Sequence, residues 1–272
     1  MNGRKRRILL DVGGTFIKCD DGRSVPVDSG GDRASVATSL REAVGECAPG
    51  DLVAVAIPGP FDFGNGTFLM KHKFASVYGE RFQDVAGIPE GVDVRFIHDV
   101  NCMLLGELVS GAGKGYRNVA LVTLGTGLGF SMAIDRKILK APSGSPAVSI
   151  YARPFRDGIL EDYVSKRGIL RMYELFGGSA GCTVKEVARR ASLGEIAALG
   201  AFRQVAEILA LSLKDILSEY GIECLLFGGQ ISHAFPFMQE AFEEPFRFLR
   251  RISPVSDFDR ATFNGLEVLL KR

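Results

Sequence analysis

The sequence predicts an α/β fold made of two similar halves, and two glycine-bearing hairpins are the reason. Residues 121–134, LVTLGTGLGFSMAI, combine two apolar strands with a tight turn through Gly125, Gly127 and Gly129. Residues 8–19, ILLDVGGTFIKC, repeat this pattern roughly a hundred residues earlier. Glycine adopts positive φ freely and lets backbone N–H groups point at an anion. The repeat therefore predicts a duplicated unit and a nucleotide held by both hairpins.

Length and composition are those of an ordinary globular protein. A chain of 272 residues suits one large or two medium domains. Hydrophobic residues make up 46% and charged residues 24%, and the net charge is +1. This balance gives no reason to expect nucleic acid or an anionic membrane as a partner. Any bound anion must be held by local groups.

The cysteines and the N-terminus favour a cytoplasmic protein. Five cysteines form no CxxC pair, so neither a disulfide framework nor a thiolate zinc site is indicated. The basic run Arg4–Arg7 precedes only three apolar residues before Asp11, which is too short for a signal peptide. No later segment is expected to reach the length of a membrane span.

The first half alternates predicted strands and helices. After the first hairpin we expect a helix within residues 30–50, a buried strand at 52–57, a loop or irregular hairpin at 61–66, a short amphipathic segment at 82–86 and a strand at 94–97. Apolar residues at helical spacing follow this last strand, so Asp99 lies at a strand-to-helix junction. Such junctions are where α/β sheets place ligand chemistry.

A glycine-rich linker, Gly111–Gly115, marks the predicted domain boundary. The expected domains are residues 1–112, residues 113–256 and a terminal helix within 257–272 that packs back on the N-terminal domain. In the second half we expect a loop at 141–149, helices at 160–176, 183–191 and 195–220, a strand at 223–227 followed by a helix, and a last helix at 263–270.

Six motifs, in order along nearly the whole chain, resemble those of the ROK family, whose name stands for repressor, open reading frame and kinase. They are Asp11–Lys18 (DVGGTFIK), Ala56–Pro60 (AIPGP), His98–Asn101 (HDVN) with Gly106-Glu107, Leu124–Gly129 (LGTGLG), Leu160–Val164 (LEDYV) and Gly228–Ser232 (GGQIS). The resemblance implies a two-domain actin-like ATPase (ribonuclease H-like) fold with a central cleft. It also implies an ATP-dependent kinase that phosphorylates a hydroxyl of a sugar or sugar-like acceptor.

The resemblance also assigns the nucleotide site. Asp11 is expected to hold the Mg²⁺ of ATP through water, since Mg²⁺ prefers oxygen ligands and keeps part of its hydration shell. The expected phosphate-binding residues are Gly13, Gly14, Thr15 and Lys18 in one domain and Gly125, Thr126 and Gly127 in the other, with Gly228 and Gly229 at the adenosine. The alternatives are that Asp11 only caps the turn and that the glycines form an ordinary hairpin, while strand position leaves open whether Lys18 reaches phosphate or solvent.

Asp99 is the expected general base, because phosphoryl transfer to a hydroxyl needs a carboxylate to accept the proton. The family sets this aspartate beside an asparagine; here His98 stands in that place, while Asn101 is kept. The alternative is that Asp99 is a helix N-cap, a common position for aspartate. One residue can serve both roles.

The expected acceptor-binding residues are Pro58, Gly59, Asp99, Asn101 and Glu161. Glu161 falls where the family has a sugar-binding glutamate, but an acid is also favoured in the first turn of any helix.

The acceptor site is also where this chain departs from the family. Val148 and Tyr151 stand where an acid and a histidine would hold the sugar, and Lys73 stands near a usual asparagine. No cysteine lies between positions 103 and 181, so no zinc is expected. These changes leave the identity of the acceptor open.

The second hypothesis is a catalytically degenerate sensor of sugar or nucleotide, because some family members are repressors. Those carry a helix-turn-helix domain ahead of the first hairpin, whereas ten residues precede Asp11 here, so DNA binding is not expected. A homodimer is implied by the resemblance alone.

Overall fold

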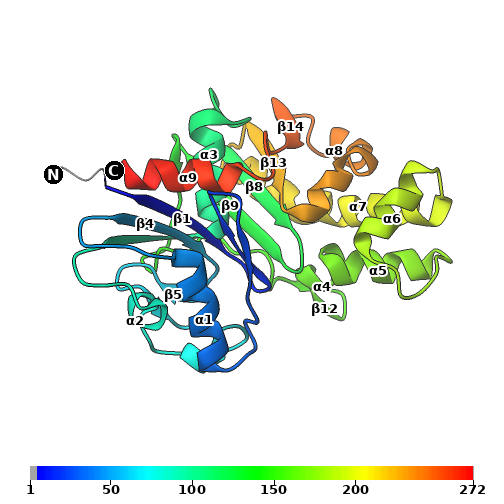
Figure 1. Ribbon diagram of the computed structural model, residues 1–272. Helices are drawn as coiled ribbons and strands as arrows, with labels where there is room; N and C mark the ends of the chain where they lie inside the picture. The colour runs from blue at the N-terminus through cyan, green and yellow to red at the C-terminus, as the bar shows by residue number, and fades with distance from the viewer. Residues whose placement is uncertain (1–4, 272) are drawn as a thin grey trace. The chain divides into compact units, whose positions relative to one another are not determined.

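In the computed structural model, residues 5–271 are described, and the chain divides into two compact units. Unit 1 comprises Met1–Val109, Lys140–Ala147 and Asp259–Arg272, and unit 2 comprises Ser110–Leu139 and Val148–Phe258. Each unit contains one mixed five-stranded sheet with its own helices (Figure 1).

The sheet of unit 1 is led by the first hairpin. Its strands, in spatial order, are β3 (Ser24–Pro26), β2 (Phe16–Cys19), β1 (Arg7–Val12), β4 (Leu52–Ile57) and β7 (Asp93–His98). β1 pairs antiparallel with β2, while β1, β4 and β7 are parallel. The carboxyl ends of these three strands therefore lie at one edge of the sheet, where ligands bind in open α/β sheets.

The helices of unit 1 are α1 (Arg33–Val44), α2 (Phe82–Ala86), α3 (Asp99–Ser110) and α9 (Ala261–Leu270), with a 3₁₀ turn at Ala75–Val77. Asp32 caps α1 by accepting a hydrogen bond from the N–H of Ser35 at 2.8 Å. The small hairpin of β5 (Phe61–Asp62) and β6 (Thr67–Phe68) is the irregular hairpin that the glycine-bearing segment predicts.

Helices α3 and α9 pack with their backbones almost in contact (Figure 1). A Cβ added to Gly106 would lie 2.1 Å from the carbonyl oxygen of Ala261, and one added to Gly265 would lie 2.0 Å from that of Cys102. Only glycine fits at these two positions. α9 also contacts β1 and β4, so the end of the chain packs on the sheet of unit 1.

The sheet of unit 2 repeats the plan of unit 1. Its strands are, in order, β10 (Lys137–Ile138), β9 (Leu128–Ile134), β8 (Val119–Leu124), β13 (Cys224–Gly228) and β14 (Arg251–Pro254). β8 and β9 form an antiparallel hairpin, and β8, β13 and β14 are parallel. The predicted α/β fold with a duplicated hairpin-led sheet is confirmed.

Two predicted helices of unit 2 differ in the structure. The helix expected at 160–176 is two helices, α4 (Leu160–Val164) and α5 (Lys166–Leu175), because Ser165 adopts an extended conformation with ψ of −172°. The segment after β13 is a 3₁₀ helix, Gln230–Phe237, with Pro236 inside it. The remaining elements are α6 (Val184–Ser192), α7 (Ile196–Glu219), α8 (Glu240–Glu243) and the short strands β11 (Pro154–Phe155) and β12 (Gly158–Ile159).

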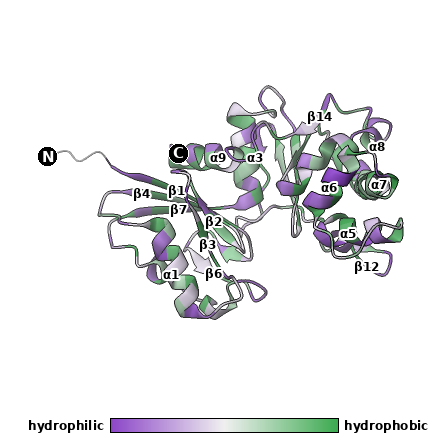
Figure 2. Cartoon of the chain, turned by 45° about the vertical axis from the view of Figure 1, so that its right-hand side comes forward, coloured by the Kyte–Doolittle hydropathy of each residue, from purple (hydrophilic) through white to green (hydrophobic). Residues whose placement is uncertain are grey.

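The long helix α7 has the length and apolar composition of a membrane span. The expectation that no segment reaches that length is therefore wrong. Half of its most apolar stretch is buried, and Phe202, Val205 and Leu209 lie in the core of unit 2. Hydrophilic residues are interspersed along α7 and dominate the neighbouring α6 in Figure 2. Core packing thus accounts for its apolar residues.

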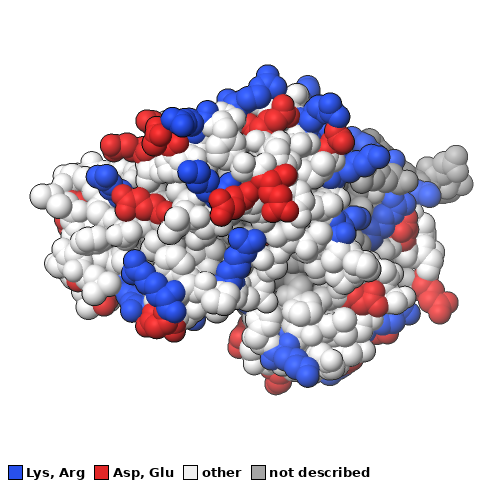
Figure 3. Space-filling model, turned by 180° about the vertical axis from the view of Figure 1, so that it is seen from behind, with Lys and Arg blue, Asp and Glu red and all other residues white. Residues whose placement is uncertain are grey.

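The surface charges are mixed in sign. Figure 3 shows Lys and Arg interspersed with Asp and Glu over the face that it presents. Many of these charges are paired: on successive turns of α7, Nε of Arg203 lies 3.0 Å from Oε1 of Glu207. Such an alternation produces no broad field of one sign on this face.

Candidate active site

Polar groups gather where the parallel strands of unit 1 end. Asp11 lies near the end of β1, Pro58 and Gly59 directly follow β4, and Asp99 directly follows β7. The strand order β1-β4-β7 places both aspartates at the carboxyl edge of the sheet. Each carboxylate influences the pKa of other groups there, so the electrostatics of this edge are coupled.

The turn of the first hairpin offers two backbone donors. The N–H of Gly13 donates to the carbonyl of Phe16 at 2.9 Å and closes the turn. Within residues 5–271, the N–H groups of Gly14 and Thr15 donate to no protein acceptor. The carbonyl of Gly14 accepts from the N–H of Ser29 at 3.3 Å, which fixes the turn against the next loop. Two free donors on a fixed turn are suited to an oxyanion.

Asp11 has the most perturbed carboxyl at this edge. Burial and the negative charge of Asp99 raise the pKa of Asp11 to about 7, whereas the charge of Lys18 lowers it. Lys18 also forms an ion pair with Asp259, with 3.6 Å between Nζ and Oδ1. A carboxylate three residues before the first free N–H group of the hairpin fits a magnesium–nucleotide complex, because Mg²⁺ prefers oxygen ligands.

Asp99 is held between a backbone donor and an imidazole. Its Oδ1 accepts from the N–H of Val100 at 2.7 Å and lies 2.7 Å from Nδ1 of His98. The contact with His98 lacks the direction of a good hydrogen bond, and it is an ion pair only when the imidazole is protonated. Burial raises the pKa of Asp99, but the imidazole of His98, the N–H of Val100 and the charge of Lys73 outweigh burial, so the pKa lies below its ordinary value.

The observed bond does not make Asp99 an N-cap of the usual kind. An N-cap side chain accepts from the N–H two or three residues later. Asp99 instead is the first residue of α3 and accepts from the next residue. Its side chain is 42% exposed, so one face of the carboxylate remains open to a substrate.

Asn101 fixes a loop of unit 1. Its side-chain N–H donates to the carbonyl of Gly144 at 3.2 Å, and the residue is fully buried. This bond ties the loop at 140–147 to α3. Gly59 lies nearby, since a Cβ added to it would be 3.5 Å from Oγ of Ser145. The role of Asn101 in acceptor binding stays a prediction.

The second hairpin, in unit 2, has the same donor pattern as the first. The N–H of Gly125 donates to the carbonyl of Gly127 at 3.0 Å. In the described part of the chain, the N–H groups of Thr126 and Gly127 donate to no protein acceptor. The next donor, the N–H of Leu128, is taken by Oε2 of Glu161 at 2.9 Å.

Through this hydrogen bond, the Glu161 carboxylate stabilises the turn of the second hairpin. A Cβ at Gly127 would lie 2.8 Å from Oε2 of Glu161, so the carboxylate sits directly against the turn. Its other oxygen is 3.4 Å from the guanidinium of Arg167. The sugar contact expected of Glu161 therefore competes with a structural bond that the sequence did not indicate.

Gly229 allows β13 to end against the second hairpin. Its φ is +79°, and an added Cβ would lie 2.4 Å from the carbonyl oxygen of Leu124. No other residue fits there. Gly228 and Gly229 thus place bare backbone at the carboxyl end of β13, where the adenosine contact is expected.

The positions that depart from the family pattern have no acid or imidazole to offer. Val148 packs against the core of unit 2, and Tyr151 is 49% exposed. Among residues 5–271, no three His, Cys, Asp or Glu side chains are grouped to hold a metal ion. The expected absence of zinc stays a prediction.

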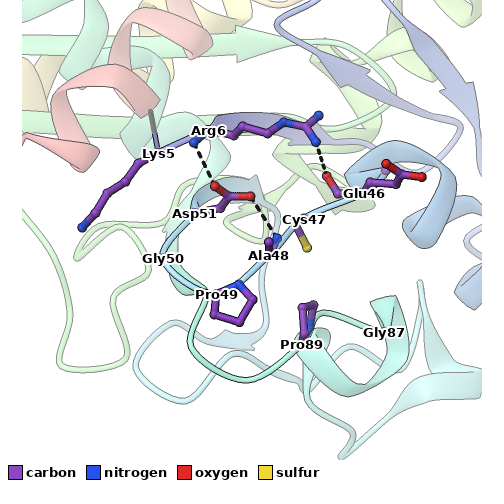
Figure 4. Close-up of a pocket in the computed structure, with 11 residues that line it drawn as sticks. Lys5, Arg6, Glu46, Cys47, Ala48, Pro49, Gly50, Asp51, Gly87 and Pro89 are labelled. Atoms are coloured by element: carbon purple, nitrogen blue, oxygen red, sulfur yellow. Dashed lines mark hydrogen bonds between the residues drawn. The ribbon is translucent and has the colours of Figure 1, made fainter. Parts of the chain in front are cut away.

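Figure 4 shows a hollow of about 950 Å³ whose lining includes Arg6 and Asp51, which precede β1 and β4, so it lies at the opposite edge of the unit 1 sheet from Asp11 and Asp99. Asp51, just before β4, lines it, but both of its oxygens are occupied. Oδ1 accepts from the N–H of Arg6 and Oδ2 from the N–H of Ala48, each at 2.9 Å (Figure 4). The Asp51 carboxylate is therefore engaged in holding the backbone around β4.

A family model described as the ROK family matches residues 35–262, which is most of the chain. The chain belongs to the ROK family. The family resemblance drawn from six motifs is thereby confirmed.

Two curated relatives match over most of their length. The N-acetyl-D-glucosamine kinase of Yersinia enterocolitica is 24% identical over 243 residues, covering 82% of this chain and 79% of that protein. The glucokinase of Halalkalibacterium halodurans is 23% identical over 304 aligned residues, which cover 94% of this chain and 90% of that protein.

The fold also matches a solved ROK structure. The ROK family glucokinase of Streptomyces griseus, in complex with glucose and AMPPNP, superposes with a TM-score of 0.77 and 22% identity, covering 97% of this chain and 98% of that one. This match confirms the predicted fold class, two mixed α/β sheets of the hexokinase and actin type.

Sequence reasoning missed Ser29 and Ser145, which line the turn of Gly14 and the backbone of Gly59. Both lie in loops, where no periodic pattern marks a residue. For Ser145 the available signal was the Pro, Ser and Gly content of residues 141–149, a composition typical of loops, which often carry functional residues.

Proposed function

We propose that this ROK protein is an ATP-dependent carbohydrate kinase that transfers the γ-phosphoryl group to a hydroxyl of a sugar or sugar-like acceptor. One observation carries the proposal: Asp99, with an open carboxylate face, shares a sheet edge with Asp11 and with the two free N–H groups of the first hairpin. Relatives named as glucokinase and N-acetyl-D-glucosamine kinase support the reaction class.

The phosphate oxygens of ATP are bound by backbone donors. The N–H groups of Gly14 and Thr15, together with the Thr15 hydroxyl, bind them in unit 1. The N–H groups of Thr126 and Gly127 offer the same kind of site in unit 2. Backbone donors carry no charge and cost little reorganisation when charge moves on the phosphate, which suits phosphoryl transfer.

Asp11 is the residue that would hold Mg²⁺, through water. The metal, when bound, neutralises charge on the phosphates and orients them. Because the pKa of Asp11 is about 7 in the protein alone, this carboxyl is partly protonated near neutral pH. It must ionise before it can hold the ion.

Asp99 acts as the general base. The acceptor hydroxyl oxygen attacks the γ-phosphorus while Asp99 takes its proton. The bond from the γ-phosphorus to the β,γ-bridging oxygen breaks, and ADP leaves. The low pKa of Asp99 keeps the carboxylate ionised and ready to accept this proton.

The acceptor contacts are proposed for Pro58, Gly59, Asn101 and Glu161, with Val148 and Tyr151 replacing the usual acid and histidine. A site that has lost polar partners favours a different set of hydroxyls. In the described part of the chain none of the five cysteines forms a disulfide, which supports a reducing, cytoplasmic location. The homodimer stays a prediction.

The test is ADP release from Mg·ATP with a panel of hexoses and amino sugars, with phosphorylated product identified by mass. A kinase gives acceptor-dependent ADP and a product heavier by one phosphoryl group. A degenerate sensor instead binds sugar or nucleotide, measured by calorimetry, and releases no ADP with any acceptor.

A further inference from the structure

Lys73 lies against the first hairpin of unit 1. A Cβ added to Gly14 would be 3.5 Å from Cε and 3.6 Å from Cδ of Lys73. The end of the lysine side chain therefore runs alongside the turn whose N–H groups are free. The family pattern alone would put Lys73 only near the acceptor.

The backbone fastens Lys73 in this position. The next residue, Phe74, is fully buried, and its N–H donates to the carbonyl of Ser29 at 2.5 Å. The N–H of Ser29 in turn donates to the carbonyl of Gly14. The loop that carries Lys73 is thus joined to the hairpin through one residue, which holds the lysine close to the turn.

Lys73 also influences Asp99, the proposed base. Its charge lowers the pKa of Asp99, so the ammonium lies close enough to the carboxylate to influence it. Yet within residues 5–271 no carboxylate oxygen lies within 4.0 Å of its Nζ. Lys73 is partly buried, which leaves an ammonium partly withdrawn from water and without an ion pair.

The other lysines near this edge differ. Lys18 is paired with Asp259, and Lys71 is exposed, with Nζ 5.5 Å from the ring centroid of Tyr78. Of these three cations, Lys73 alone lies against the phosphate-binding turn and also lowers the pKa of Asp99.

We propose that Lys73 is a catalytic residue whose ammonium contacts the γ-phosphoryl oxygens of ATP. The inference rests on the proposed kinase function. As the bond to the β,γ-bridging oxygen breaks and the bond to the acceptor oxygen forms, negative charge is spread over the three γ-oxygens. A fixed cation beside them stabilises that charge, while the acceptor proton goes to Asp99.

The test compares K73M with the matched control K71M, which removes a lysine charge from the same loop. Affinities for Mg·AMPPNP and Mg·ADP are measured by calorimetry, because only the first has the γ-group. We expect K73M to weaken AMPPNP binding roughly tenfold and to leave ADP binding unchanged, since a charge-assisted hydrogen bond is lost. K71M should change neither.

Turnover gives the second readout, with the acceptor found in the panel above. We expect kcat of K73M to fall by roughly 10²–10³-fold, the size seen when one donor to a developing charge is removed. K73R keeps the charge and should recover part of the loss. If K73M does not fold, as judged by circular dichroism, K73Q is used instead.

Three outcomes overturn the proposal while the kinase function stands: equal loss of AMPPNP and ADP affinity, normal turnover by K73M, or a loss confined to acceptors that carry a carboxylate. The last would mean that Lys73 binds the acceptor. A wild-type protein that binds neither nucleotide defeats the proposed function, and this inference with it.

Discussion

His98 Nδ1 lies 2.7 Å from Asp99 Oδ1, so the proposed base has an imidazole as its direct neighbour. The histidine side chain is only 17% exposed, its ring lies 5.8 Å from that of Phe63, and Gly59 leaves room for it. A packed ring cannot turn away, which fixes one oxygen of Asp99. We therefore expect His98 to act as a positioning residue for the proposed base.

The first prediction follows from this pair. His98 lowers the pKa of Asp99, so H98A should raise that pKa and move the acid limb of the kcat/KM profile to higher pH. H98N keeps an N–H donor without charge and should shift the limb less. The profile is measured from pH 4 to 8. An acid limb that stays in place in H98A would show that His98 only packs.

The second prediction tests Asp99 itself. Asp99→Asn keeps the shape but cannot accept the proton, so kcat should fall by roughly two to four orders of magnitude with nucleotide affinity nearly unchanged. Activity is measured by ADP release and affinity by calorimetry. If Asp99 were only a cap, asparagine would replace it almost silently.

The third prediction concerns Asp11 in metal-free protein. Its folded pKa, about 7, lies above the ordinary value of 3.8, so folding favours the protonated form. The contribution of Asp11 to the free energy of unfolding is therefore fully present below about pH 4. It is lost as the pH rises toward and through 7. The Tm of wild type in EDTA should fall from pH 5 to pH 8 by about 2 °C or more relative to Asp11→Asn. Parallel curves for the two proteins would contradict the raised pKa.

The fourth prediction separates the two roles of Glu161. If the carboxylate braces the second hairpin, E161A leaves the N–H of Leu128 without its acceptor and should weaken nucleotide binding severalfold. E161Q keeps an acceptor oxygen and should weaken it less. A sugar contact gives another pattern, a higher KM for the acceptor with the nucleotide Kd unchanged in both variants.

The fifth prediction tests the close packing of α3 and α9. Gly106→Ala brings a Cβ to 2.1 Å from the carbonyl oxygen of Ala261 and should destabilise the protein by about 1–3 kcal/mol or more. Gly200→Ala in α7 is the control, because its Cβ would only reach 3.4 Å from Phe176. That change should be neutral or stabilising by up to about 1 kcal/mol. Equal Tm values for the two variants would rule out the tight contact.

The sequence alone determined the elements whose patterns are local. The two hairpins, the buried strand β4 and the long helix α7 are visible because apolar runs, glycine turns and helical spacing involve neighbours in the chain. The same logic placed Asp99 at the end of β7 and Asp11 near the end of β1. Strand ends can be located from the sequence because turn residues or a change of period follow them.

Only the tertiary structure decided which distant residues meet. Three contacts join segments that are far apart in the sequence: Lys73 lies beside Gly14, Asn101 donates to Gly144, and Glu161 accepts from the N–H of Leu128. The break at Ser165 and the strand β14 likewise have no local signal strong enough to predict them. The physical reason is that side-chain contacts depend on how the strands and helices pack, whereas periodicity records only which face of each element is buried.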